Sequence, residues 1–151
     1  MDTRNRWGRL AAALGCAGMT LASAPALSAP ASQAFRERPP QDEVIYFVLA
    51  DRFANGDPSN DRGGLSGDRL ATGYDPADKG FFHGGDFKGL TGKLDYVQGL
   101  GATAIWLAPI FVNKPVQGPK GQESAAYHGY WITDFTDVDP HLGTKADFKA
   151  L

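Results

Sequence analysis

The stretch VIYFVLA, residues 44 to 50, decides the fold, because it is a continuous run of β-branched, aromatic and aliphatic side chains. It lacks the alternation of a strand with one wet face, so it predicts a strand covered on both faces, as in a parallel sheet. A second run, ATAIWLAPIF, spans residues 102 to 111 and is predicted to be another buried strand that Pro109 ends. Trp106 lies inside this second run and is therefore predicted to be core.

The residues between the two runs predict a helix. Apolar side chains recur there at helical spacing, at Phe87, Leu90, Leu94, Val97 and Leu100. Gly101 then provides a helix stop, and Thr144 is the predicted N-cap of a second helix in GTKADFKAL. Strand, long loop, helix and strand form a βαβ unit with a large insertion after the first strand.

These elements predict an α/β fold, namely the N-terminal part of a (β/α)8 TIM barrel with long βα loops. A complete barrel needs about 250 residues, so we expect an incomplete one with about two βα units in this chain of 151 residues. A small doubly wound sheet is the alternative. Two strands are few for that fold, and no G-x-G-x-x-G motif follows the first strand.

The N-terminus resembles a secretory signal peptide. Residues 1 to 29 combine three arginines with a run of small apolar residues and several cleavage options of the A-x-A type. An N-terminal membrane anchor is the alternative. We expect cleavage between Ala26 and Ala31, a flexible lead-in over residues 30 to 43, and a barrel portion over residues 44 to 151. The predicted location is secreted or periplasmic, with no membrane contact after cleavage.

The overall composition is that of a globular protein, with 42% hydrophobic and 21% charged residues. The net charge is −2 and no basic stripe is present, which argues against a nucleic-acid partner. Cys16, the only cysteine, lies in the predicted signal peptide, so the mature chain has no disulfide. A bound metal ion is a common way to stabilise such an exported chain.

The loop after the first strand contains a cluster of oxygen-bearing side chains. Within NGDPSND these are Asn55, Asp57, Asn60 and Asp61, and Asp86 follows in HGGDF. Carboxylate and amide oxygens are the ligands that Ca²⁺ takes, at six to eight per ion. An ordinary turn rich in Asn and Asp is the alternative. An EF-hand is excluded because Arg62 occupies its glycine position, and no Cys/His spacing indicates zinc.

The segment AAYHGYWITDF, residues 125 to 135, gathers four aromatic rings around a histidine and a glycine. Tyr and Trp offer a flat apolar face with a polar tip, which suits the apolar face of a sugar ring. A packed loop corner has a similar composition, so composition leaves both interpretations open. Residues 132 to 135 are predicted to be packing. The acids Asp134, Asp137 and Asp139 are predicted to be solvated.

Four segments together resemble one family. They are DEVIYFVLADRFANGDPSND (residues 42 to 61), HGGDFKGL (83 to 90), LGATAIWLAP (100 to 109) and AYHGYWITDFTDVDPHLGTKADFKAL (126 to 151). In this order they resemble the α-amylase family of glycoside hydrolases (glycoside hydrolase family 13). The resemblance covers residues 43 to 151. The nearest similarity is to bacterial α-amylases and cyclomaltodextrin glucanotransferases.

The resemblance implies a TIM-barrel domain that cleaves α-1,4-glucans with retention, by hydrolysis or transglycosylation. It implies that Tyr130 stacks on the sugar at the cleavage subsite and that His128 and Trp131 lie beside it in the donor subsites. It also implies a Ca²⁺ cofactor whose ligands come from two segments, namely Asn55, Asp57, Asn60, Asp61, the Gly84 carbonyl and Asp86.

The family's nucleophilic Asp, acid/base Glu and third Asp follow later strands, so no catalytic residue is expected in this chain. We therefore expect these residues to be the N-terminal part of a secreted enzyme that is a monomer at full length, and to be inactive alone. A non-catalytic secreted protein that binds calcium and α-glucan is the alternative.

Overall fold

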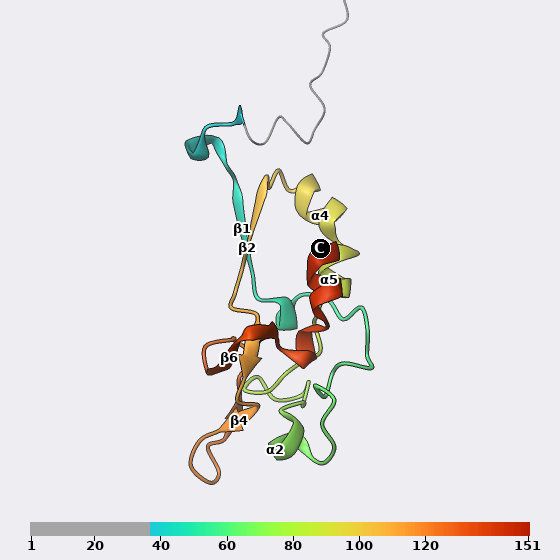
Figure 1. Ribbon diagram of the computed structural model, residues 1–151, viewed down its shortest axis with the longest axis vertical. Helices are drawn as coiled ribbons and strands as arrows, with labels where there is room; N and C mark the ends of the chain where they lie inside the picture. The colour runs from blue at the N-terminus through green and yellow to red at the C-terminus, as the bar shows by residue number, and fades with distance from the viewer. Residues whose placement is uncertain (1–36) are drawn as a thin grey trace, which may run out of the picture. The chain divides into compact units, whose positions relative to one another are not determined.

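The computed structural model describes residues 37–151. The predicted signal peptide and the first part of the lead-in lie outside the described residues. The described chain begins with a 3-10 turn, η1 (Pro40–Asp42), and continues into strand β1 (Ile45–Val48). Strand β2 (Ala104–Leu107) pairs with β1 in parallel, with Ile45 opposite Ala104 and Val48 opposite Leu107. The predicted parallel pair is confirmed (Figure 1).

Two short helices connect these strands where the sequence predicted one. Helix α3 (Phe87–Thr91) ends at Gly92, and helix α4 (Leu94–Gly99) begins after Lys93, whose backbone has left the helical region. Phe87 and Leu90 are fully buried, which stabilises the fold by roughly 1.5–3 kcal/mol per side chain. Helix α5 (Lys145–Ala150) follows the predicted N-cap Thr144, which forms a capping box with Asp147.

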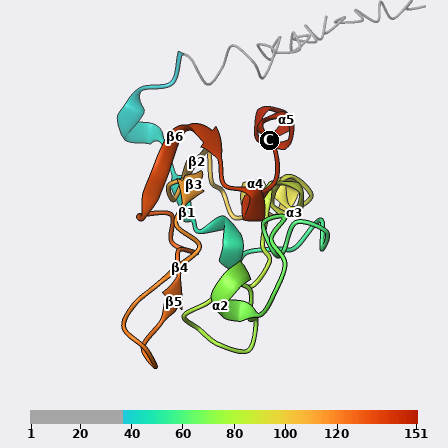
Figure 2. The same cartoon turned by 60° about the horizontal axis from the view of Figure 1, so that its bottom comes forward.

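Helices α3, α4 and α5 lie on one side of the strand pair. Figures 1 and 2 show α4 and α5 together beside β1 and β2, with α3 next to them in the second view. The rings of Phe87 in α3 and Phe148 in α5 are 5.4 Å apart, which joins the two helices. Phe87 also packs in a core cluster with Ala50, Val138 and Leu142.

The prediction that both faces of the strands are covered is wrong for the described residues. Trp106 is 63% exposed, and Ile45 and Phe47 on β1 are exposed as well. Only two parallel strands pair here, and no element among residues 37–151 buries these side chains. The apolar sequence identified the strand correctly, and Trp106 is exposed because the parallel sheet has only two strands among the described residues.

Residues after β2 form antiparallel strand pairs for which the sequence analysis gave no prediction. Strand β3 (Phe111–Asn113) pairs with β6 (Ile132–Val138), and β4 (Val116–Gln117) pairs with β5 (Ser124–Ala125). Figure 2 shows the β4–β5 hairpin extending away from the β1–β2 pair. The Phe135 ring on β6 lies 5.7 Å from that of Phe111 on β3, as the packing prediction requires, but Phe135 is still 69% exposed among the described residues.

The long insertion after β1 contains short elements of its own. A 3-10 turn, η2 (Ala50–Arg52), follows the strand, and helix α2 (Arg69–Thr72) lies within the insertion. Asp68 caps α2 by accepting from the backbone of Leu70 and Ala71. A last 3-10 turn, η3 (Pro140–Leu142), precedes α5. Among the described residues, no helix has the length and apolar character needed to cross a membrane.

Candidate functional site

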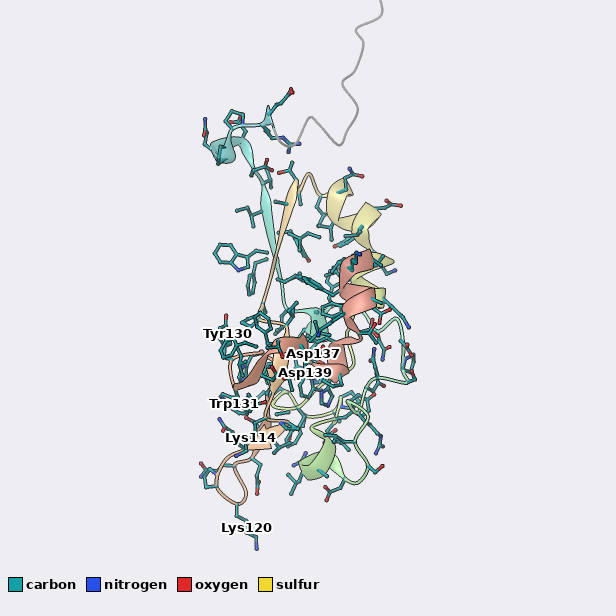
Figure 3. All side chains as sticks on the ribbon, in the orientation of Figure 1. Lys114, Lys120, Tyr130, Trp131, Asp137 and Asp139 are labelled. Carbon is teal, nitrogen blue, oxygen red and sulfur yellow. The ribbon has the colours of Figure 1, made fainter. Side chains whose placement is uncertain are left out.

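The three residues predicted to contact sugar come together in the loop between β5 and β6. The rings of His128 and Tyr130 are stacked, 5.7 Å apart at 26°. Trp131 meets the His128 ring edge-on at 4.7 Å. Tyr130 is 66% exposed, and Figure 3 shows it at the same edge of the structure as Trp131. We call His128, Tyr130 and Trp131 the aromatic platform.

Gly129 allows the backbone of the platform to approach the end of β2 closely. Its φ is +81°, and a Cβ atom there would lie 2.0 Å from the carbonyl oxygen of Pro109. Only glycine allows this backbone conformation and this approach without strain. The platform therefore lies at the carboxyl end of β2, which is the end of the strands where barrel enzymes have their active sites.

One ring nitrogen of His128 is engaged by the backbone of the platform. Its Nδ1 accepts a hydrogen bond from the backbone N–H of Tyr130 at 3.0 Å. Partial burial lowers the pKa of His128, which disfavours the imidazolium form. In the neutral ring the proton therefore sits on Nε2, where it can be donated to a hydroxyl group.

An ion pair between Arg52 and the buried Asp51 follows β1 and contacts Tyr127, the residue before the platform. The Arg52 guanidinium lies 3.9 Å over the ring of Tyr127, next to the platform, and also pairs with Asp51 at 2.5 Å. Asp51 is buried, and this burial raises its pKa despite hydrogen bonds from the backbone N–H groups of His83 and Gly84. These bonds fix the segment that contains the Gly84 carbonyl.

Asp86 organises the predicted calcium loop from a fully buried position. One carboxylate oxygen accepts from the backbone of Gly56 and Gly89, and so caps α3. The other accepts from the backbone of Asp57 and from the side-chain amide of Asn60. The two predicted ligand segments, about thirty residues apart, are therefore joined at Asp86.

Other predicted ligands gather beside Asp86. The Asn55 amide donates to Asp61 at 2.7 Å, and a Cβ atom on Gly84 would lie 2.5 Å from that Asp61 oxygen. The Oδ1 atom of Asn60 is buried without a hydrogen-bond partner. An orphaned buried acceptor is costly, by about 1–3 kcal/mol, and a cation is one way to satisfy it. These residues therefore fit an oxygen-liganded cation.

Asp57 is placed differently from the other predicted ligands. Its carboxylate accepts from Lys88 Nζ at 2.6 Å and from Ser59. The Lys88 and Ser59 hydrogen bonds lower the pKa of Asp57 to about 2. Within residues 37–151 no three His, Cys, Asp or Glu side chains form a metal-binding group, so a cation at this loop depends on amide and carbonyl oxygens as well.

Sequence reasoning missed a buried polar group next to the platform, made of Asn113, Asp139 and His141. Asp139 was predicted to be solvated with its neighbours, but it is 3% exposed and hydrogen-bonded to both other residues. Asn113 lies on β3, 26 residues before Asp139, so spacing alone could not find this partner. The one available indication was the Asp-Pro pair, since Asp139 caps the 3-10 turn η3.

Comparison with known proteins identifies the family. Residues 47–151 match the sequence model described as "Alpha amylase, catalytic domain". An α-amylase of Streptomyces lividans is 69% identical over 87 residues, which are 58% of this chain and 10% of that protein. A periplasmic α-amylase of Escherichia coli is 46% identical over 72% of this chain and 16% of that protein.

A solved structure gives the same result. A crystal structure of a cyclomaltodextrin glucanotransferase superposes with a TM-score of 0.62 at 46% identity, covering 72% of this chain and 22% of that one. The chain thus spans a tenth to about a fifth of the length of these relatives. The fold is α/β and is part of a TIM barrel that is not closed within the described residues. With its strand pair, its aromatic loop and this family match, the chain belongs to the α-amylase family of glycoside hydrolases.

Proposed function

We propose that this chain is the N-terminal part of a secreted or periplasmic α-amylase-type enzyme that cleaves α-1,4-glucans with retention. "The complete enzyme" below means the protein that contains this chain. The observation that carries the proposal is the exposed Tyr130 ring, held at the carboxyl end of β2 in a chain of this family. We further propose that the complete enzyme is a monomer.

The chemistry of the platform suits a sugar ring. The Tyr130 face is apolar and exposed, so the C–H face of a pyranose ring can stack on it. His128 Nε2 can donate to a sugar hydroxyl, and the Trp131 ring adds apolar surface beside it. The proposed roles are stacking at the cleavage subsite for Tyr130 and contacts in the donor subsites for His128 and Trp131.

We propose that the oxygen-rich loop binds Ca²⁺. The candidate ligands are Asn55, Asn60, Asp61, the Gly84 carbonyl and Asp86, together with Asp57. The orphaned Oδ1 of Asn60 supports this proposal most strongly. The ion would supply positive charge that holds the long insertion after β1 against the start of α3.

Tyr130→Ala in the complete enzyme is expected to lower kcat on maltoheptaose by roughly 10- to 100-fold, because stacking orients the sugar ring for the transition state. Phe135→Ala is the matched control, since Phe135 is equally exposed on the adjacent strand β6. Steady-state kinetics of both variants make the test. Equal kcat values for Tyr130→Ala and wild type would remove Tyr130 from the site.

Residues 30 to 151 expressed alone are expected to show no starch hydrolysis. Retaining cleavage needs two carboxyl groups about 5 Å apart that flank the scissile bond. Of the acids near the platform, Asp139 is buried against His141, and Asp134 is bonded to Thr136. A starch–iodine assay checks this, and turnover by the isolated segment would refute it.

A further inference from the structure

A chain of hydrogen bonds runs from the aromatic platform to the long insertion after β1. It starts at the backbone N–H of Trp131, which donates to Asn113 Oδ1 at 2.7 Å. The backbone N–H of Asn113 donates to Asp139 Oδ2 at 2.9 Å. His141 Nδ1 lies 2.7 Å from Asp139 Oδ1, and His141 Nε2 lies 2.7 Å from the carbonyl oxygen of Thr72. Four segments distant in sequence are thereby joined.

Asn113 has only one orientation that satisfies this arrangement. Its side-chain Nδ2 donates to the carbonyl oxygen of Phe111 at 2.6 Å, which leaves Oδ1 to accept from Trp131. Reversing the amide would place its NH2 group against the Trp131 N–H and its oxygen against the Phe111 carbonyl. Asn113 is buried, so water cannot replace these partners. The start of β6 is therefore fixed by one side chain of β3.

Asp139 holds both Asn113 and His141. Besides the Asn113 backbone it accepts from the His141 backbone N–H at 3.0 Å, and both residues are almost completely buried. An aspartate carboxylate accepts hydrogen bonds but does not donate them, so each of its hydrogen-bond partners must be a donor. His141 Nδ1 therefore carries a proton.

The second ring nitrogen of His141 must carry a proton as well. The Thr72 carbonyl oxygen can only accept, and it lies at hydrogen-bonding distance from Nε2. Both ring nitrogens of His141 therefore face acceptors, and the geometry points to a doubly protonated ring beside the buried Asp139 carboxylate. Phe82 stacks on the ring at 3.9 Å and 2°, which is favourable for a cation.

The ion pair touches both functional regions. Phe82 belongs to the core cluster against which Tyr127 and Trp131 pack. On the other side, a Cβ atom on Gly63 would lie 2.4 Å from the His141 ring, so the insertion packs directly on the imidazole. A shift of His141 would therefore move the insertion and the platform together.

We propose that Asp139 and Asn113 are positioning residues for the aromatic platform, and that His141, held as an imidazolium between Asp139 and Thr72, connects the platform to the insertion after β1. This inference rests on the proposed function of the platform as a glucan site. Neither residue touches the sugar; both act through the backbone of Trp131, which orients the rings of Tyr130 and Trp131.

Asp139→Asn in the complete enzyme tests the proposal, because an amide places an NH2 group where all neighbours are donors. We expect kcat/KM on maltoheptaose to fall about tenfold and the cleavage pattern of end-labelled maltoheptaose to shift. The pattern does not depend on the fraction of active protein, so a merely structural loss would leave it unchanged. In a Trp131→Ala background the same substitution is expected to have a much smaller effect.

Asp137→Asn is the matched control. Asp137 lies two residues earlier on the chain, is exposed, and pairs with Lys145 at 3.2 Å at the surface. We expect its kinetics and cleavage pattern to equal those of wild type. The proposal is overturned if Asp139→Asn behaves like Asp137→Asn. It is also overturned if Asp139→Asn lowers kcat/KM without shifting the cleavage pattern, and if its effect on kcat/KM is as large in the Trp131→Ala background as in the wild type.

Two further measurements distinguish a failure of the proposed function from a failure of this proposal. If Tyr130→Ala and Trp131→Ala leave kcat/KM unchanged, the proposed function fails, whatever Asp139→Asn does. If Asp139→Asn does not fold, NMR of the wild-type complete enzyme labelled with ¹⁵N-histidine decides, with the His141 signals assigned by their loss in His141→Gln. We expect protons on both ring nitrogens at neutral pH; a single ring proton would contradict the proposal.

Discussion

Gly129→Ala in the complete enzyme is expected to lower the melting temperature by roughly 5–10 °C, or to prevent folding. Two costs combine at this position. An alanine at φ +81° costs about 1–2 kcal/mol. Its Cβ atom would also lie 2.0 Å from the Pro109 carbonyl oxygen, which is backbone and cannot turn away, so the turn must separate from the end of β2. Calorimetry of the purified variant measures the effect.

Gly121→Ala is the control for this prediction. Gly121 has a φ of +86°, close to that of Gly129, but no atom lies within 4 Å of its would-be Cβ. Gly121→Ala therefore has the free-energy cost of an alanine at positive φ, but no clash with a neighbouring atom. The difference between the two variants measures how tightly the platform is pressed against β2. Equal melting temperatures would show that the close approach of Gly129 to Pro109 does not exist in the enzyme.

Removal of calcium by a chelator is expected to lower the melting temperature of the complete enzyme by about 5 °C or more. An ion present at about 100 times its dissociation constant stabilises by about 2.7 kcal/mol. Asn60→Ala is expected to abolish this response because it removes the orphaned buried Oδ1. The quantity to compare is the difference in melting temperature with and without calcium, taken for each variant. The variant lacks the hydrogen bond from Asn60 to Asp86 in both conditions, so this loss cancels in the difference.

Two other substitutions complete the calcium experiment. Asp95→Ala, on the exposed side of α4, is expected to keep the full response to chelator. Asp57→Ala tests whether the Asp57 carboxylate leaves Lys88 to bind the ion. A smaller effect of chelator on the melting temperature would make Asp57 a calcium ligand, and an effect equal to that in wild type would show that it is not one. The calcium proposal is rejected if chelator has no effect on wild type or if Asn60→Ala retains the wild-type response.

Local patterns were sufficient to predict the elements whose conformation depends on nearby residues. The apolar run at residues 44 to 50 identified β1, and Thr144 marked the start of α5, because strand and cap preferences are local. The break between α3 and α4 was missed. Gly92 and Lys93 interrupt the helix although the apolar spacing runs through them, so periodicity alone predicted a single helix.

Burial could not be predicted in the same way, because it depends on partners that are distant in sequence. Trp106 is exposed among residues 37–151, where only two parallel strands pair and the barrel is not closed. Asp139 looks like a solvated acid, yet its carboxylate is buried and accepts a hydrogen bond from the backbone of Asn113, 26 residues away. A charged group is buried when such partners surround it, and the sequence does not display them.

The candidate site also combines features that nearby residues predict with features that depend on tertiary packing. His128, Tyr130 and Trp131 are close in sequence, so their proximity was predictable from the segment itself. The contact of Gly129 with Pro109 and the exposure of Tyr130 depend on how that segment packs on β2, and only the structure gives them. The support of the platform by Asn113 is likewise a tertiary feature.

The central claim is that Tyr130 is a stacking platform for α-glucan. A crystal structure of the complete enzyme with bound maltoheptaose tests this claim most directly. We predict a pyranose ring lying flat on the Tyr130 ring at van der Waals distance, about 3.5–4.0 Å between carbon atoms, with a hydroxyl accepting from His128 Nε2. An ordered glucan in the active site that leaves the Tyr130 ring uncovered would contradict it.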